Sequence, residues 1–333
     1  MAVFTNTLQT FAAVGIREDL SDVILNTSPT ETMFVSMCRK GATKSRTPEY
    51  MKDRLRNPNP ANKTIEGDDV TAADAVIQPT RLKSVVQLFD EVVTVSDTAR
   101  AVDTAGRPDD LKYHVAKAGK ALKTDMEMRF LGNYASVLGN STTAGESAGA
   151  EAWITTNVDR GATGANGGFN TGTGLVAAAT DGTARAFTET LLKGVIKKVW
   201  DYGGEPTTIM MTGAKKQTAS AFAGIAQLHN DVNGQNRVVI FGSADLYKSD
   251  FGHHKFVANR FAGASGTRSA TNGLYPGNSV LVLTPEVWEI KFLQPFKVVD
   301  LARTGHAEKR MLKAEATLCC KDEGVNGVIA DLT

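Results

Sequence analysis

The chain has 333 residues, with 37 basic against 36 acidic side chains and a net charge of +1. This balance argues against a protein that grips nucleic acid mainly through a basic face, and the length allows one or two domains. No run of about 18 apolar residues predicts a membrane span, the first residues lack the features of a signal peptide, and three cysteines make no disulfide framework.

Residues 16–24 form a short amphipathic segment in which apolar residues recur at helical spacing. Its charged members are Arg17, Glu18, Asp19 and Asp22. Charges on such a segment are usually solvated and contribute little to stability. We favour docking on another chain, with the apolar side buried and the charges paired, because the segment has no local core to lie on.

Residues 47–55 and 81–90 alternate weakly between apolar and polar side chains, and the chain between them contains the sequence Asn57-Pro58-Asn59-Pro60. Proline fits neither a helix interior nor a central strand. The pattern predicts a two-stranded ribbon with a proline-rich tip. An isolated hairpin is only marginally stable in water, so this ribbon needs a surface to lie on. A disordered linker is the alternative. It is less favoured because 85–89 and 92–95 are strong strand formers with only the first arm to pair with locally.

A long helix is predicted over residues 107–139. Pro108 suits a first helical turn, and Asp109 and Asp110 complement the positive end of the helix dipole. Gly139 and Asn140 are candidate stop signals. An apolar stripe follows, made of Leu111, Val115, Ala118, Leu122, Met126 and Phe130. Such a helix would be roughly 45–50 Å long, which is longer than a small domain is wide.

Residues 140–186 are rich in Gly, Ala and Thr and are interpreted as loop, attached to the body by Trp153 and Ile154. A compact α/β region follows. Thr188 is a good N-cap for a helix that ends at Gly203-Gly204, and a second helix is expected over 214–222. The expected strands are 209–211, 238–241, 255–258, 279–283, 287–293, 296–301 and 309–320.

Little in the sequence indicates chemistry. The stretch Gly172–Ala177 matches a dinucleotide fingerprint only formally, because it follows glycine-rich loop rather than a strand. We interpret His253 and His254 as the surface of a hairpin rather than a metal site. Cys319 and Cys320 are expected to be small apolar fillers on opposite faces of a strand. We therefore expect no catalytic residue, cofactor or metal.

Several short segments occur in a fixed order along the chain and carry a resemblance. They are Ile-Arg-Glu-Asp-Leu-Ser-Asp-Val-Ile at 16–24, 28–32, 66–68, 95–99, 106–107, 123–127, 203–206 and 301–307. As an ordered set this pattern resembles the major capsid proteins of tailed bacteriophages with the Hong Kong 97-like fold, over nearly the whole chain. The stretches 140–186 and 262–275 match no segment of that pattern, and their roles stay open.

The resemblance implies an α+β fold in five parts. They are an N-terminal arm (1–44), an extended loop (45–95), a peripheral domain (96–186) with the spine helix 107–139 and a glycine-rich insertion, an axial domain (187–295), and return strands of the peripheral domain (296–333). By their places on the arm and loop, the candidate inter-subunit contacts are Arg17, Glu18, Asp19, Asp22, Asn57, Asn59, Lys63, Glu66 and Asp68.

The resemblance also implies a structural function rather than catalysis. Many copies would assemble as pentamers and hexamers into an icosahedral shell around double-stranded DNA, within a virion built in the bacterial cytoplasm. The implied partners are a portal protein, separate scaffolding and decoration proteins as further candidates, and packaged DNA bound non-specifically. Because only about 15 residues precede the first motif, we expect a separate scaffold or none. Lys52, Lys63 and Lys83 are placed for cross-linking to asparagines, which occurs in part of the superfamily but is not expected here.

Three alternatives stay open at this point. An encapsulin-like nanocompartment shell would use the same fold around a protein cargo. An α/β enzyme would place its site in the central region. A decoration or minor structural protein would be present in the particle at a different copy number.

Overall fold

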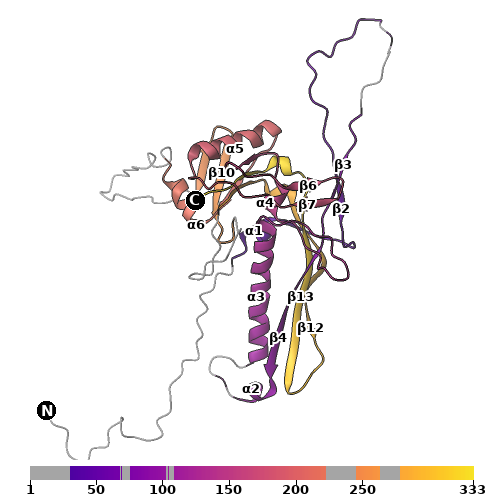
Figure 1. The fold of residues 1–333 in the computed structure, drawn as a ribbon, viewed down its shortest axis with the longest axis vertical. Helices are drawn as coiled ribbons and strands as arrows, with labels where there is room; N and C mark the ends of the chain where they lie inside the picture. Colours follow the sequence, from indigo (N-terminus) through magenta and orange to yellow (C-terminus); the bar gives the residue numbers. More distant parts are fainter. Residues whose placement is uncertain are drawn as a thin grey trace, which may run out of the picture.

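The computed structural model describes residues 31–67, 69, 76–102, 104, 109–222, 245–262 and 278–333. The molecule is elongated, with one long helix lying beside the long strands β4 (Gln87–Ser96), β12 (Trp288–Asp300) and β13 (Ala307–Cys320) and a smaller α/β body at one end (Figure 1). A thin ribbon projects from the body, away from the long helix. The shape is therefore that of a molecule with several extended surfaces rather than one compact globule.

The long strands belong to a four-stranded sheet of order β1-β12-β13-β4. Its strands are β1 (Arg39–Ala42), β4 (Gln87–Ser96), β12 (Trp288–Asp300) and β13 (Ala307–Cys320). β1 runs parallel to β12, and the other pairs are antiparallel. The β12–β13 register shifts twice between Phe292 and Lys297. Pro295 lies in this interval and has no N–H to donate to the ladder, so β12 continues through it as one irregular strand.

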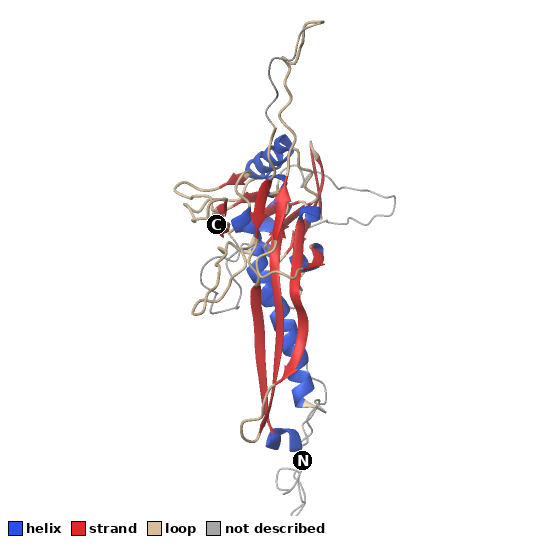
Figure 2. Cartoon of the chain, turned by 90° about the vertical axis from the view of Figure 1, so that its right-hand side faces the viewer, coloured by secondary structure: helices blue, strands red, loops and turns tan. Residues whose placement is uncertain are grey.

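Helix α3 (Asp110–Leu131) covers one face of this sheet, as Figure 2 shows. All members of its expected apolar stripe except Val115 are buried, and Leu122 and Met126 are each 1% exposed. Phe130 packs edge-on against Phe89 of β4, with ring centroids 5.8 Å apart. Asp109 caps the helix by accepting a hydrogen bond from the Lys112 N–H at 3.2 Å. The sheet and helix together supply about half of the buried residues of one hydrophobic core.

The expected extension of this helix to residue 139 is wrong, because α3 ends at Leu131. At 22 residues it is about 33 Å long. Beyond it, the Asn133 side chain exchanges two hydrogen bonds with the backbone of Ala179, and the Ser136 N–H donates to the carbonyl of Val176. These contacts with a segment about 40 residues further on replace the helical hydrogen bonds that the local sequence favours.

The α/β body is built on a six-stranded sheet of order β5-β14-β11-β8-β10-β9. Its strands are β5 (Val158–Asp159), β8 (Thr208–Met211), β9 (Leu246–Ser249), β10 (Gly252–Ala258), β11 (Val280–Leu283) and β14 (Gly327–Ile329). One face carries α5 (Glu189–Tyr202) and α6 (Gly213–Ser220) around a second core cluster. Alternate residues of β8 and β11, including Met210 and Leu281, point to the other face and join the first core.

The remaining elements are short. They are α1 (Met33–Met37), β2 (Glu49–Lys52), β3 (Thr80–Lys83), α2 (Asp97–Ala101), α4 (Ala150–Trp153), β6 (Gly168–Asn170), β7 (Leu175–Ala177), η2 (Pro285–Val287) and η3 (Glu323–Val325). The glycine-rich stretch thus contains a helix and a β6–β7 hairpin. Trp153 and Ile154 are buried as expected, and Trp153 stacks on Phe169 at 5.7 Å.

The helix α5 has the predicted caps. Thr188 accepts a hydrogen bond from the Leu191 N–H, and Gly203 adopts a left-handed conformation with φ 99°. The two-stranded ribbon is also confirmed, but β3 ends at Lys83. Residues 87–96 pair with β13 instead of with the first arm. The predicted strand over 238–241 lies outside the described residues.

Three further expectations need correction. Residues 296–333 are not all return strands of the long sheet, because β14 lies in the six-stranded sheet. The expected axial domain (187–295) also extends too far, because β12 begins at Trp288 and belongs to the long sheet. His254 is not at the surface, since it is 1% exposed and hydrogen-bonds the Pro206 carbonyl and the Ser249 hydroxyl. All three cysteines are free and buried.

Candidate assembly surfaces

Three parts of the described structure are described in turn: the ribbon, the far end of the long sheet, and the root of the N-terminal arm. Within the described ranges, no group of three His, Cys, Asp or Glu side chains is placed to hold a metal ion. No helix among those residues is long and apolar enough to cross a membrane. The ribbon, the far end of the long sheet and the root of the arm are the candidate contact surfaces.

The ribbon is anchored at its root by Lys52 at the end of β2. The Lys52 ammonium donates hydrogen bonds to Asp322 Oδ1 at 2.5 Å and to the Tyr202 hydroxyl at 2.9 Å. Burial lowers the pKa of Lys52, but the hydrogen bonds to Asp322 and Tyr202 outweigh it and raise that pKa above its ordinary value. This latch ties the ribbon to the end of α5 and to the segment before η3.

Tyr50 supplies a second anchor on the same strand. The Cys320 N–H donates to the Tyr50 hydroxyl at 3.1 Å, and the Lys291 ammonium lies 5.7 Å from the centre of the Tyr50 ring. A cleft of about 260 Å³ lies beside these anchors, with Arg54, Trp153 and Lys52 among its lining residues. The two anchors fix the direction in which the ribbon leaves the body.

Beyond its root the ribbon exposes apolar side chains to water. Leu55 is 92% exposed, Val76 80% and Ile65 77%. Single exposed apolar residues are ordinary, but several on one thin projecting segment have no core of their own to join. Such a set is typical of a surface that another chain covers.

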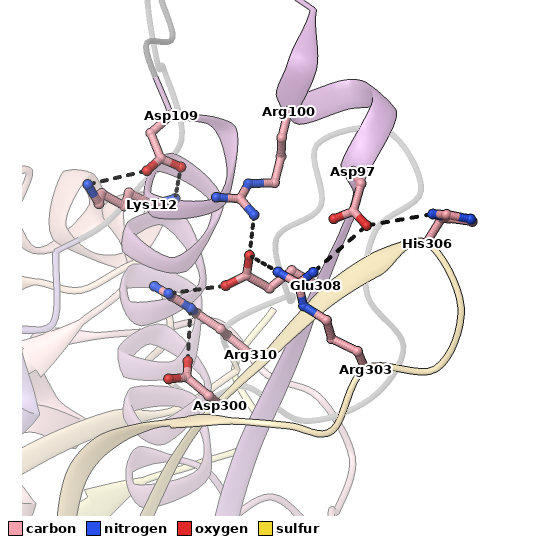
Figure 3. Close-up of polar contacts among 9 residues, drawn as sticks. All are labelled: Asp97, Arg100, Asp109, Lys112, Asp300, Arg303, His306, Glu308 and Arg310. Carbon is pink, nitrogen blue, oxygen red and sulfur yellow. Dashed lines mark hydrogen bonds and ion pairs between the residues drawn. The ribbon is translucent and has the colours of Figure 1, made fainter.

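The far end of the long sheet carries a charged tip, formed by α2, the end of β12 and the start of β13 (Figure 3). Glu308 lies at its centre, where Arg100, Arg303 and Arg310 all pair with its carboxylate. Arg310 also pairs with Asp300 at 3.0 Å. Three arginines around one carboxylate hold the turn between β12 and β13 against α2.

Part of this charged tip is free to meet a partner. The side chains of Asp300 and Arg303 are 78% and 59% exposed, and that of His306 is 99% exposed. Asp97 is 4.0 Å from both Arg303 and His306. Exposed ion pairs of this kind add little stability to a single chain. They are well placed to set orientation and partner choice.

The root of the arm is fixed by Glu127, which is fully buried on α3. Its carboxylate accepts hydrogen bonds from the N–H groups of Phe34 and Val35, both at 2.7 Å, and from the Asn259 amide at 2.6 Å. Thr32 makes no side-chain cap on α1, so Glu127 takes over that role. Burial raises the pKa of Glu127, and these three hydrogen bonds oppose the rise.

The predicted contact residues divide into two groups. Arg17, Glu18, Asp19, Asp22 and Asp68 lie outside the described residues. Asn57, Asn59, Lys63 and Glu66 lie on the projecting ribbon and are exposed. Their described contacts are local, such as the hydrogen bond from the Ala61 N–H to Asn59 Oδ1 at 2.9 Å. They remain predicted contacts.

Sequence reasoning missed the three anchoring groups, Lys52, Glu127 and Glu308. Lys52 was noted only for cross-linking, and its partner Asp322 lies 270 residues away. Glu127 and Phe34 are 93 positions apart. A usable signal existed for Glu127, because it directly follows Met126 in the apolar stripe of a helix. A carboxylate next to a buried stripe needs hydrogen-bond donors if it is buried.

Comparison with known proteins gives a consistent result. A family model described as the SU10 major capsid protein matches residues 3–333. The major capsid protein of Escherichia phage Phieco32 is 26% identical over 340 residues, which cover 91% of this chain and 90% of that protein.

Solved structures agree on the fold. A chain of Gordonia phage Cozz has a TM-score of 0.60 at 10% identity, covering 99% of this chain and 97% of that chain. A chain of Mycobacterium phage Ogopogo has a TM-score of 0.59 at 11% identity, covering 98% and 100%. These likenesses confirm the expected α+β fold of the Hong Kong 97-like type.

The family match spans nearly the whole chain, and the curated relative is also a phage major capsid protein. Neither favours the nanocompartment shell or the α/β enzyme that the sequence left open. The chain is a structural component of a phage virion. It is a tailed-phage major capsid protein and belongs to the SU10 major capsid protein family.

Proposed function

We propose that copies of this chain close into an icosahedral shell through the ribbon, the charged tip and the N-terminal arm, and that the shell packages double-stranded DNA. The ribbon is the observation that carries this proposal. Its root is locked to the body by Lys52, while Leu55, Ile65 and Val76 are exposed on its projecting part. A rigid root with an apolar end suits a clamp on a neighbouring subunit.

The parts of the fold are then assigned by their positions. The six-stranded sheet with α5 and α6 is the axial domain, which meets its copies at the centres of pentamers and hexamers. The long sheet with α3 is the peripheral domain, and its charged tip meets the tips of neighbouring capsomers. Contacts repeated over many copies are individually modest and still give a stable particle, because a leaving subunit breaks several at once.

The partners follow from the same architecture. One pentamer position is taken by a portal protein, and packaged DNA meets the inner wall without sequence preference. A net charge of +1 suits that wall, since a strongly basic surface would bind packaged DNA tightly and oppose its release. One structural relative, from phage G, was solved together with decoration proteins, and we propose decoration and scaffolding proteins as further partners. Assembly takes place in the bacterial cytoplasm.

We also propose that the chain has no catalytic activity. The family is a structural one, and the buried charged groups among the described residues serve as anchors between segments. Glu127 caps α1, for example, and the buried His254 joins β9, β10 and the loop before β8. The His254 ring bonds the Ser249 hydroxyl, but its other nitrogen meets the Pro206 carbonyl and not a carboxylate as in a catalytic triad.

The test is expression of the full chain, followed by purification and negative-stain electron microscopy. We expect closed shells or ring-shaped capsomers, first alone and then together with candidate scaffold and portal proteins. Nuclease-protected DNA in particles from infected cells supports the packaging role. A small soluble oligomer under all these conditions, or shells that hold a protein cargo in place of DNA, contradicts the proposal.

A further inference from the structure

The surface of α3 that is not packed against the long sheet carries four exposed lysines, Lys112, Lys117, Lys120 and Lys123, called here the lysine face. The buried stripe of the same helix, including Leu122, lies against the sheet. Lys120 lies two positions from Ala118 and from Leu122, and at 3.6 residues per turn it points away from both. Lys120 is therefore opposite to the packed side of the helix, and Lys117 and Lys123 lie on its two flanks, toward β4 and β12.

Two lysines of this face have acidic neighbours within the described chain. Lys112 pairs with Asp109 at 3.3 Å. Burial and the nearby Asp125 raise the pKa of the Glu91 carboxyl, and Lys117 is close enough to oppose that rise. The part of the chain that the structure describes gives Lys120 and Lys123 no ion pair, and Lys123 lies 5.9 Å from the centre of the Phe296 ring. The middle of the lysine face is thus a row of positive charge without a described counter-charge.

The root of the arm lies on this same side of α3. Glu127 follows Lys120 by seven residues, close to two helical turns, so the two side chains point in nearly the same direction. The Glu127 carboxylate accepts from the N–H groups of Phe34 and Val35, which are at the N-terminal end of α1. The residues that precede α1 therefore join the described structure directly beside the lysine face.

The arm carries the complementary charge. Arg17 stands against three carboxylates, Glu18, Asp19 and Asp22, so residues 16–24 have a net charge of −2. The residues from 25 to 31 reach at most roughly 25 Å when extended. Along α3, Lys120 and Lys112 lie about 10 Å and about 22 Å from Glu127. The segment is therefore within reach of the whole lysine face.

We propose that residues 16–24 dock along the lysine face of α3, with Glu18, Asp19 and Asp22 paired to its lysines. The proposal deepens the role of the arm in the proposed function and names its receiving surface. Packaged DNA is the other polyanion that could meet this face. The arm is favoured because its root is already fixed there, and because its apolar side needs a non-polar surface such as Ala116 and Tyr113 between the lysines.

Cysteine cross-linking of assembled particles tests the proposal. Asp19→Cys is combined with Lys120→Cys, and the native cysteines contribute little background because all three are buried. The matched control combines Asp19→Cys with Lys297→Cys. Leu312 faces α3, so the next residue of β13, Lys313, points to the opposite face of the sheet. Lys297 is exposed and lies directly across the β12–β13 ladder from Lys313, so it lies on that opposite face as well. Shells are first verified by electron microscopy, which separates a failure of assembly from a failure of docking.

We expect disulfide formation at Lys120→Cys to be at least about tenfold faster than at Lys297→Cys, because docking raises the effective concentration. Particles are also assembled from a mixture of the single variants Asp19→Cys and Lys120→Cys. Docking on the same chain gives no disulfide-linked dimer in this mixture, whereas docking on a neighbouring copy gives one. Equal rates at the two positions overturn the proposal.

Charge reversal gives an independent readout. Lys120→Glu with Lys123→Glu should lower the yield of shells severalfold, and Glu18→Lys with Asp19→Lys should restore it. Circular dichroism of the unassembled subunit checks that each variant folds, and the cross-linking test above needs no charge reversal. A yield that the arm substitutions do not restore, together with loss of packaged DNA, assigns the face to DNA and overturns the proposal.

Discussion

Glu127→Ala removes the acceptor that holds the root of the N-terminal arm. In the wild-type protein its carboxylate accepts three hydrogen bonds at 2.6–2.7 Å from Phe34, Val35 and Asn259. Each buried donor left without a partner costs about 1–3 kcal/mol. Water that enters the space left by the side chain would bond some of these donors and lower that cost. The variant also no longer buries a charged carboxylate, which lowers the net cost further. We expect the free energy of unfolding to fall by about 2–4 kcal/mol.

The assay is denaturant unfolding of the unassembled subunit, with Lys123→Ala as the matched control on the same helix. Lys123 is exposed, and its removal should change the free energy of unfolding by less than about 0.5 kcal/mol. Amide hydrogen exchange adds a local readout, since protection of the Phe34 and Val35 N–H groups should be lost first. Equal stability of Glu127→Ala and wild type, with those amides still protected, would refute the role assigned to Glu127.

Three further predictions concern the core, pH and the ribbon. Leu122→Asp buries an unpaired charge against the long sheet, at a cost of several kcal/mol, and should give insoluble protein, whereas soluble Leu122→Asp would show that the buried side of α3 is misassigned. Burial raises the pKa of Glu151 to about 7 from an ordinary 4.5. The folded protein therefore binds the proton of the Glu151 carboxyl more tightly than the unfolded chain does, and the free energy of unfolding should fall by up to about 3 kcal/mol as pH rises from 4.5 to 7. This pH dependence should be absent in Glu151→Gln. An unchanged pH dependence in that variant contradicts the role given to Glu151. Lys52→Ala should leave the melting temperature within a few degrees of wild type but lower shell yield, because Asp322 no longer fixes the ribbon; normal yield by sedimentation would show that the latch is dispensable.

The sequence predicted those elements whose signals are local. Helix α5 carries Thr188 at one end and Gly203 at the other, and both caps are formed as expected. The end of α3 could not be predicted, because residues 133–136 pair with 176–179 instead of continuing the helix. The periodic apolar pattern of the helix contains no sign that residues 176–179 compete for the backbone of residues 133–136.

The anchors were hidden for the same reason. The latch from Lys52 to Asp322 and the cap from Glu127 to α1 join positions 270 and 93 residues apart. The buried His254 looked like hairpin surface because its partner, the Pro206 carbonyl, lies on another strand connection. The resemblance, in contrast, used short segments spread in order along the chain, and it gave the correct fold and function without any of these contacts.

Deletion of the ribbon tip, residues 57–63, tests the central claim most directly. The matched control replaces the same residues by a Gly/Ser stretch of equal length, which separates reach from side-chain contact. Circular dichroism should show a folded, soluble subunit in both cases, because the tip joins no core of the described chain. Negative-stain microscopy of the deletion variant should show no regular closed shells. Normal shells from that variant would contradict the claim that the ribbon clamps a neighbouring subunit.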